Sequence, residues 1–166
     1  MNAPRVMAFV ARSGTGKTTL VEALIALAAE RGLRVGALKH DAHRFDMDRP
    51  GKDSHRFTTA GATVTIVAAD DKLALIRQHD ACPPVADLIA RHAADLDLVL
   101  VEGWKTSTLP RIEVHRPSLG RPLLDAEHPH LVAVAADAPV AAPVPVLDLN
   151  DPAAVLSFIL DRAEAP

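Results

Sequence analysis

The pattern of apolar and polar residues over the first 39 positions predicts a strand, a loop, a helix and a second strand. The apolar run 5–11 has the length and composition of a strand that is buried on both faces. Residues 12–16 form a glycine-rich loop, and residues 18–31, rich in Ala, Leu and Glu, predict a helix that stops at Gly32. Residues 33–39 predict the next strand, and a strand–helix–strand unit of this length indicates parallel pairing with a right-handed crossover.

The rest of the chain continues this alternation. Further strands are predicted at 63–68, 97–102, 111–115, 131–136 and 144–149, with an additional one at 72–77. Helices are predicted at 52–60, at 84–94 and at the C-terminus, where an N-cap type residue and a proline open the last helix in Asn150-Asp151-Pro152. The polar intervals 40–51 and 116–130 are expected to be loops. Strands alternating with helices indicate an α/β fold.

The amino-acid composition limits the classes of protein to which the chain can belong. The chain has 166 residues, of which 49% are hydrophobic, which suits one compact domain with a core of its own. Aromatic residues make up only 3%, so we expect a core of Val, Leu, Ile and Ala. A net charge of −3 argues against nucleic-acid binding, and no apolar run reaches the length of a membrane span. The single cysteine, Cys82, cannot form an intramolecular disulfide, which favours the reducing cytoplasm.

Residues 11–18, Ala-Arg-Ser-Gly-Thr-Gly-Lys-Thr, have the spacing of a phosphate-binding loop (P-loop). Ala11 replaces the usual first glycine, which requires that this position does not need a positive φ. Glycines let successive backbone N–H groups point inward around an anion, and the helix that follows adds its positive dipole end. Lys17 can reach the β- and γ-phosphates, and the Thr18 hydroxyl can bind Mg²⁺.

The position of this motif between a predicted strand and a predicted helix makes a chance match improbable. It predicts a nucleotide site built from the loop and the first helical turn, namely Arg12, Ser13, Gly14, Thr15, Gly16, Lys17, Thr18 and Thr19. It also predicts a P-loop NTPase-type three-layer fold with a mostly parallel, doubly wound sheet. We expect residues 1–166 to form a single P-loop nucleotide-binding domain.

A P-loop protein needs a carboxylate near Mg²⁺, normally at the end of a neighbouring apolar strand. Glu102 follows the apolar run 98–101 and can hold a metal-bound water or polarise the attacking water. It is therefore the candidate catalytic residue and, with Thr18, a candidate metal ligand. Trp104, the only tryptophan, either stacks on a ligand or partner or covers the edge of the core, and Lys105 beside it is a further candidate.

The segment that follows the second predicted strand is rich in histidines and charged residues. A loop at this place leaves the carboxyl end of a strand, where α/β sheets bind ligands. We expect it to sense an anion or Mg²⁺; a transition-metal site is an alternative, but the ligand spacing is not diagnostic. The candidates in this loop are His40, Asp41, His43, Lys52 and Asp53.

These residues together resemble the MobB family, the molybdopterin-guanine dinucleotide biosynthesis adapter proteins. The matching segments run through nearly the whole chain in order: 11–19, KHDAH at 39–43, DRPGKD at 48–53 with Ser54, AGA at 60–62, DLVLVEGWK at 97–105, RIEVHR at 111–116, 133–137 and 146–151. The resemblance implies a GTP-binding protein, at most a slow Mg²⁺-dependent GTPase, that acts as a homodimer. It implies a partner as well, the guanylyltransferase that joins GMP to molybdopterin, with molybdopterin itself as a further candidate ligand.

The sequence contains no Asn-Lys-x-Asp motif, the usual guanine reader among GTPases. Asp137 follows the strand predicted at 131–136 and stands where the Asp of that motif would stand in such folds. Its carboxylate would accept hydrogen bonds from guanine N1–H and N2–H and would not suit adenine. We therefore include Asp137 in the candidate nucleotide site, together with the segment 149–151.

Two other functions use the same loop. A small-molecule kinase or ligase would transfer phosphate to an acceptor, and Arg111, Arg116 and Arg121 are available for a lid, although no compact lid pattern is visible. A non-catalytic nucleotide-sensing module would use the nucleotide only to set the shape of a dimer. The motif contains no evident arginine finger, so any intrinsic hydrolysis is expected to be slow. Both hydrolysis of GTP and its transfer to a partner fit the sequence.

Charge is distributed unevenly along the chain. Residues 31–57 contain seven basic and four acidic residues, and residues 100–123 contain four and two. Residues 124–166, in contrast, contain one basic and seven acidic residues. The basic surplus falls on the stretches expected beside the P-loop, which suits a small phosphorylated ligand.

Overall fold

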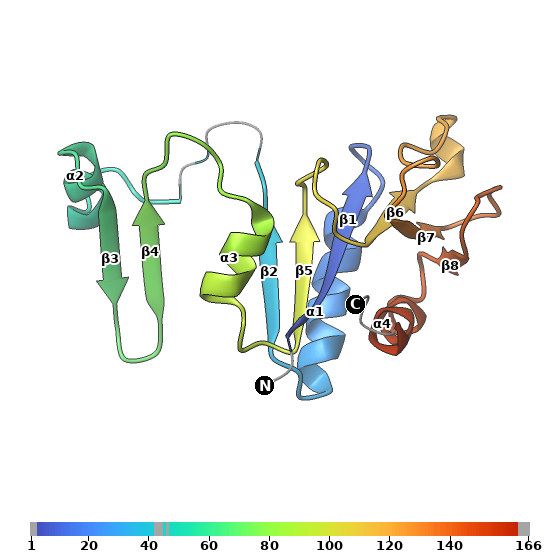
Figure 1. Ribbon diagram of the computed structural model, residues 1–166, viewed down its shortest axis with the longest axis horizontal. Coiled ribbons are helices and arrows are strands. Elements are labelled where there is room, and N and C mark those ends of the chain that lie inside the picture. The colour runs from blue at the N-terminus through green and yellow to red at the C-terminus, as the bar shows by residue number, and fades with distance from the viewer. Residues whose placement is uncertain (1–2, 42–44, 46, 163–166) are drawn as a thin grey trace. The chain divides into compact units, whose positions relative to one another are not determined.

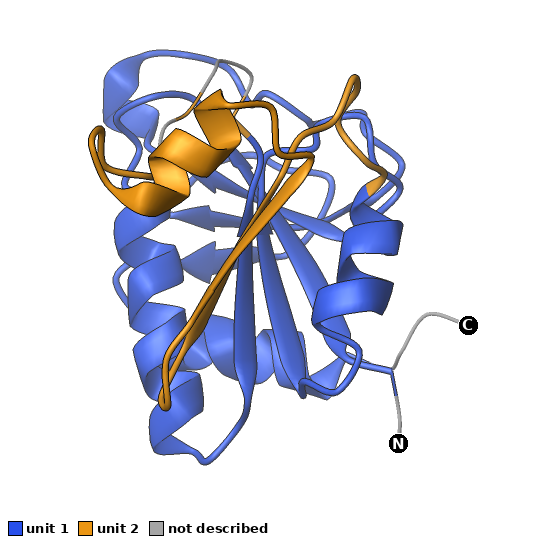
Figure 2. Cartoon of the chain, turned by 90° about the vertical axis from the view of Figure 1, so that its left-hand side faces the viewer, with its two compact units in different colours: residues 1–40, 85–166 blue, residues 41–84 orange. Residues whose placement is uncertain are grey.

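The computed structural model describes residues 3–41, 45 and 47–162, and the chain divides into two compact units (Figure 2). Unit 1 comprises residues 1–40 and 85–166 and contains β1 (Arg5–Ala11), α1 (Lys17–Glu30), β2 (Val35–Lys39), α3 (Val85–His92), β5 (Leu98–Glu102), β6 (Arg111–His115), the 3-10 helix η1 (Pro117–Leu119), β7 (Leu131–Ala136), β8 (Val146–Asp148) and α4 (Pro152–Asp161). Unit 2 comprises residues 41–84 and contains α2 (Asp53–Thr59), β3 (Val64–Ala68) and β4 (Leu73–Arg77).

Six parallel strands form the sheet of unit 1, in the order β2-β5-β1-β6-β7-β8 (Figure 1). The direct pairing of the first two strands that we predicted is wrong, because β5 lies between β1 and β2. The burial of the two strands explains this order. Residues Leu98–Val101 of β5 are fully buried, whereas β2 is half-buried to exposed, so β5 takes an interior position and β2 becomes an edge strand.

Helices cover both faces of this sheet. On one face, α1 and α4 pack over Met7 and Phe9 of β1, and on the other, Val85 and Ile89 of α3 pack with Ala8. Successive residues of β1 therefore face opposite layers, as the pleat of a strand requires. The predicted three-layer, doubly wound α/β arrangement is confirmed. No helix in the described part of the chain is long and apolar enough to cross a membrane.

Most element boundaries differ from the sequence prediction by one or two residues. The strand predicted at 144–149 is shortened to β8, because Pro143 and Pro145 have no N–H to donate to a ladder. The interval 116–130, predicted as a loop, contains η1, which begins with Pro117. The start of α4 follows the prediction, since the Asp151 side chain caps the helix by accepting a hydrogen bond from Ala154 N at 3.0 Å.

The strands β2 and β5 are joined at their N-terminal ends by Arg34 and Asp97. Asp97 Oδ2 accepts hydrogen bonds from Arg34 N at 2.7 Å and from Nε at 3.3 Å, while Oδ1 accepts from Nη2 at 3.2 Å. These hydrogen bonds favour the charged carboxylate, so they hold the pKa of Asp97 below its usual value and raise that of Arg34.

Unit 2 is an antiparallel hairpin, β3–β4, with α2 packed on β3. Thr58 of α2 and Thr65 of β3 share a hydrogen bond between their hydroxyls at 3.0 Å, so α2 covers the face on which Thr65 lies. The opposite face contains Ile66, which pairs with Leu75, and Leu73. These three side chains are 57%, 43% and 66% exposed, respectively.

Candidate functional site

The loop between β1 and α1 has the backbone shape that the P-loop spacing requires. Gly14 and Gly16 have φ values of 82° and 90°, which L side chains rarely adopt. Ala11 needs no such conformation, because Trp104 is the only non-glycine residue with positive φ in the described part of the chain. Replacement of the usual first glycine by Ala11 therefore introduces no backbone strain.

The first turn of α1 presents unpaired backbone donors. The first intrahelical bond is donated by Leu20 N to Gly16 O at 3.0 Å, which leaves the preceding amides, including those of Thr18 and Thr19, without helical acceptors. No side chain caps this end, and its first turn contains no acidic residue. Thr15 is buried, and its hydroxyl donates to Arg12 O at 3.0 Å, which closes the loop on itself. These amides and the helix dipole favour an anion at this place.

Lys17 and Glu102 meet at this end of α1. Lys17 Nζ lies 2.6 Å from Glu102 Oε1, and the two side chains are 19% and 20% exposed. The sheet explains this contact, because β5 is the neighbour of β1 and its last residue lies opposite Phe9. The loop lysine and the carboxylate at the end of the neighbouring strand thus occupy one site.

The backbone after Glu102 turns sharply. Gly103 has a φ of 96°, and a Cβ there would lie 2.8 Å from the Cβ and 2.9 Å from the carbonyl oxygen of His40. Trp104 follows with a φ of 46°, and its ring centroid lies 5.1 Å from that of His40. The Trp104 ring also packs against the core cluster under α3. A non-glycine residue held at positive φ beside an ion pair is a signal of a functional site.

Arg116, at the end of β6, connects the P-loop to Asp137. Its Nε donates to Thr15 O at 2.8 Å, and its Nη1 donates to Asp137 Oδ2. A Cβ on Gly16 would lie 3.2 Å from Arg116 Nη2, so the guanidinium lies against the loop backbone. The second carboxylate oxygen, Asp137 Oδ1, is buried and has no hydrogen-bond partner.

The remaining candidate site residues are divided between the two units. Lys105 is exposed beside Trp104. Lys52 and Asp53 lie at the start of α2 in unit 2, where Lys52 is the N-cap and Asp53 the first helical residue. Asp41 belongs to unit 2 as well, and His43 lies outside the described residues. Within the described residues, no three His, Cys, Asp or Glu side chains come together as a metal-binding group.

The sequence analysis considered Arg111 only for a lid and did not predict the buried ion pairs and hydrogen bonds of β6. Arg111, Glu113 and His115 alternate with apolar residues and are at most 6% exposed, so three ionisable side chains lie on one buried face of a strand. Arg111 donates to the backbone of residues 105 and 107 and pairs with Asp125 at 3.1 Å, which fixes the loops beside the site. In the sequence RIEVH, ionisable residues alternate with apolar ones within a predicted strand of an α/β sheet. Charged residues are rarely buried unless they are paired, so this pattern could have indicated paired side chains beside the site.

The parallel sheet, the glycine loop after β1 and the Lys17–Glu102 pair define a P-loop nucleotide-binding protein. The family model described as "MobB: Molybdopterin guanine dinucleotide synthesis protein B" matches residues 6–137, and the chain belongs to this family.

Individual relatives agree with this assignment. The chain is 39% identical over 163 residues to the molybdopterin-guanine dinucleotide biosynthesis adapter protein of Escherichia coli (strain K12), covering 94% of this chain and 91% of the relative. It is 36% identical to the protein of the same name from Haemophilus influenzae, covering 89% and 83%.

Among solved structures, a crystal structure of molybdopterin-guanine biosynthesis protein B has a TM-score of 0.74 and 28% identity, covering 93% of this chain and 97% of that one. A MobB homologue from Bacillus stearothermophilus has a TM-score of 0.68 and 30% identity, covering 95% and 96%.

Proposed function

We propose that this protein is a GTP-binding adapter that assists the guanylyltransferase forming molybdopterin-guanine dinucleotide, in the cytoplasm. The observation that carries the proposal is the Lys17–Glu102 pair at the unpaired amides of α1. This arrangement offers a cation and backbone donors to a polyphosphate, and a carboxylate to the ion that accompanies it. The proposal treats the whole chain as one nucleotide-binding domain.

The residues present fit Mg²⁺. Thr18, whose side chain is exposed, and Glu102 offer hydroxyl and carboxylate oxygens, the donor type that Mg²⁺ prefers. When bound, Mg²⁺ would supply positive charge that offsets the negative charge of the phosphates. Glu102 already contacts Lys17, so its contact with the ion is proposed to pass through water, in keeping with the length of a glutamate side chain.

Hydrolysis by this site is proposed to be slow. Lys17 would neutralise charge that develops on the phosphates, and Glu102 would orient the water. Arg116 is the arginine that contacts the P-loop, and its contacts go to Thr15 O and Asp137. Because Arg116 is paired with a carboxylate, it would stabilise charge on the γ-phosphate less than an unpaired arginine would, and GTPases that lack such an arginine hydrolyse slowly.

Asp137 is proposed to read guanine. Its Oδ1 is buried without a donor, and a buried acceptor of this kind is stabilised by a ligand N–H. Within the segment 149–151, the Asp151 side chain is already used as the cap of α4. Asp137 therefore has the better available acceptor for guanine N1–H or N2–H.

The proposed assembly is a homodimer that engages the partner enzyme. The exposed face of the hairpin supports self-association, because a two-stranded hairpin with one uncovered apolar face is marginally stable alone. Molybdopterin is a further candidate ligand of the assembly.

Nucleotide titration tests the central claim. Wild-type protein is expected to bind GTP·Mg²⁺, and Lys17→Ala to weaken binding by about 100-fold or more, because a charge-assisted contact with the phosphates is lost. Lys72→Ala, an exposed lysine of unit 2, is the matched control and should leave the affinity unchanged. Near-normal affinity of Lys17→Ala would overturn the nucleotide site.

A pull-down with the purified guanylyltransferase, with and without GTP·Mg²⁺, tests the adapter role with the same variants. Capture that depends on nucleotide and on Lys17 supports it. Hydrolysis that stays negligible even with the partner present would favour a non-catalytic nucleotide sensor, and transfer of phosphate to a small acceptor would favour a kinase.

A further inference from the structure

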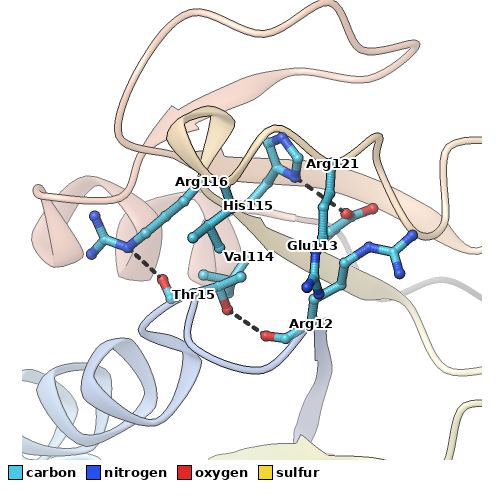
Figure 3. Close-up of a pocket in the computed structure, with 8 residues that line it drawn as sticks. Arg12, Thr15, Glu113, Val114, His115, Arg116 and Arg121 are labelled. Atoms are coloured by element: carbon cyan, nitrogen blue, oxygen red, sulfur yellow. Dashed lines mark hydrogen bonds and ion pairs between the residues drawn. The ribbon is translucent and has the colours of Figure 1, made fainter.

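The Arg116 side chain connects three parts of unit 1 that lie far apart in the sequence. Arg116 follows β6 directly, and it contacts both the P-loop that precedes α1 and Asp137, the residue after β7. Its Nε donates to Thr15 O at 2.8 Å, a contact that is drawn in Figure 3, and its Nη1 donates to Asp137 Oδ2. One guanidinium therefore holds both the P-loop backbone and a carboxylate from another strand.

The contact with Thr15 O fixes the orientation of one P-loop amide. The Thr15 carbonyl and the Gly16 N–H belong to the same peptide group, and in a planar trans peptide these two bonds point in opposite directions. Because Arg116 holds the carbonyl on its own side, the Gly16 N–H points away from the guanidinium. This N–H donates to no backbone acceptor of the described residues, so it is available to an anion in the loop.

The packing around this contact leaves little room for the loop to shift. Thr15 is 4% exposed, and its hydroxyl donates to Arg12 O at 3.0 Å. A Cβ on Gly16 would lie 3.2 Å from Nη2 and 3.8 Å from Nε of Arg116, so the guanidinium lies directly against the loop. Movement of Arg116 would therefore move the Thr15–Gly16 peptide.

The sheet places Arg116 beside Asp137. His115 pairs with Ala136 in the ladder between β6 and β7, so the next residue of each strand leaves the sheet at the same edge. Arg116 uses Oδ2 of the carboxylate, and Oδ1 is a buried acceptor without a hydrogen-bond partner. The Asn-Lys-x-Asp motif carries its cation and its aspartate on one segment. Here the cation comes from one strand and the aspartate from its neighbour.

We propose that Arg116 is a positioning residue that couples recognition of the guanine base to the binding of phosphate by the P-loop. The inference rests on the proposed function for the role of Asp137. A guanine N–H bound to Asp137 would fix the carboxylate, the carboxylate fixes Arg116, and Arg116 orients the Gly16 N–H through Thr15 O. Adenine has no N–H donor at the corresponding ring nitrogen, so ATP would leave the carboxylate unfixed.

Calorimetric titrations with GTP, ATP and tripolyphosphate, each with Mg²⁺, test this coupling, because tripolyphosphate has no base. We expect Arg116→Gln to weaken tripolyphosphate by about threefold or more, since the Gly16 amide is no longer held. It should also lower the preference for GTP over ATP by about tenfold. Arg91→Gln, an exposed arginine of α3, is the matched control and should leave all three affinities unchanged.

A double variant tests whether Arg116 acts through Asp137. Asp137→Ala combined with Arg116→Gln should have about the same preference for GTP over ATP as Asp137→Ala alone, because both changes break one chain of contacts. Two losses that multiply would show independent roles and would overturn the coupling.

A purely structural role of Arg116 gives a different result, since it would weaken GTP, ATP and tripolyphosphate by the same factor. That outcome would contradict the proposal. If Arg116→Gln does not fold, Arg116→Lys replaces it, because lysine keeps the charge but cannot make both contacts at once. Wild-type protein that binds GTP and ATP equally would refute the guanine reader of the proposed function. Tripolyphosphate then decides the role of Arg116 at the P-loop, which an unchanged affinity in the variant would overturn.

Discussion

Arg116 joins the P-loop to Asp137 in the candidate site. One guanidinium binds a P-loop carbonyl through Nε and the proposed base reader, Asp137, through Nη1. Its planar fork with several fixed donors makes these two contacts at once, which a lysine cannot reproduce. If Asp137 reads the base as proposed, the base position and the P-loop backbone are linked through this one side chain.

Loss of Asp137 should alter the choice of base. We expect Asp137→Ala to lower the preference for GTP over ATP by about ten- to hundredfold, because the guanine N–H donors lose their charged acceptor. Paired titrations of both nucleotides measure the ratio. Asp161→Ala, an exposed aspartate at the end of α4, is the control, and an unchanged ratio in Asp137→Ala would remove the base-reading role.

Gly103 is a position where the backbone allows no side chain. We expect Gly103→Ala to destabilise the protein by at least about 1 kcal/mol, since its φ is positive and the new Cβ would collide with the His40 backbone. Thermal unfolding measures this effect. Gly32→Ala is the control: its φ is also positive, but a Cβ there meets nothing within 4 Å, so the excess loss at Gly103 isolates the collision. Equal losses in the two variants would contradict this account.

At the scale of elements, the pair Arg34–Asp97 links edge strand β2 to β5. The pKa of Asp97 is lowered in the folded protein, so the carboxylate stabilises the fold above the unfolded pKa of about 3.9. That contribution is lost as the pH falls through the lower, folded pKa. We expect Asp97→Asn to unfold at a lower temperature than wild type near neutral pH, and the difference to vanish in strong acid.

Thermal melts of both proteins between neutral pH and acid measure this dependence. Asp95→Asn is the matched control, because Asp95 lies 3.7 Å from Arg34 without the three hydrogen bonds that Asp97 accepts. A difference between Asp97→Asn and wild type that persists unchanged into strong acid would contradict this assignment.

The elements themselves could be predicted from the sequence, but their neighbours in the sheet could not. Hydrophobic runs located every strand of the described chain, and the P-loop spacing located the turn that holds Lys17. Local patterns do not encode which strands are neighbours, so the insertion of β5 between β1 and β2 was missed. The contacts of Arg116 and Asp137 were missed for a related reason, because they join residues whose proximity depends on the order of β1, β6 and β7.

At the scale of the whole molecule, the hairpin is the proposed contact between two copies. Ile66, Leu73 and Leu75 lie on the hairpin face opposite α2. We expect wild-type protein to be a dimer in light scattering after size exclusion, and Ile66→Asp combined with Leu73→Asp to give a monomer, because charged groups would have to be buried at the contact.

Lys72→Asp, which introduces the same side chain into the turn region of the hairpin, should remain dimeric. GTP affinity of the double variant shows whether its P-loop remains intact. A wild-type monomer, or a double variant that stays dimeric, would contradict the hairpin contact.

Trp104 is an intrinsic fluorescent probe of the candidate site. The chain contains one tryptophan, two residues after Glu102, and its ring lies tilted against that of His40. All tryptophan emission therefore comes from the rim of the candidate site, and the absence of tyrosine leaves the signal without background. Arrival of a ligand at Glu102 can be followed in unlabelled protein by the fluorescence of this single ring.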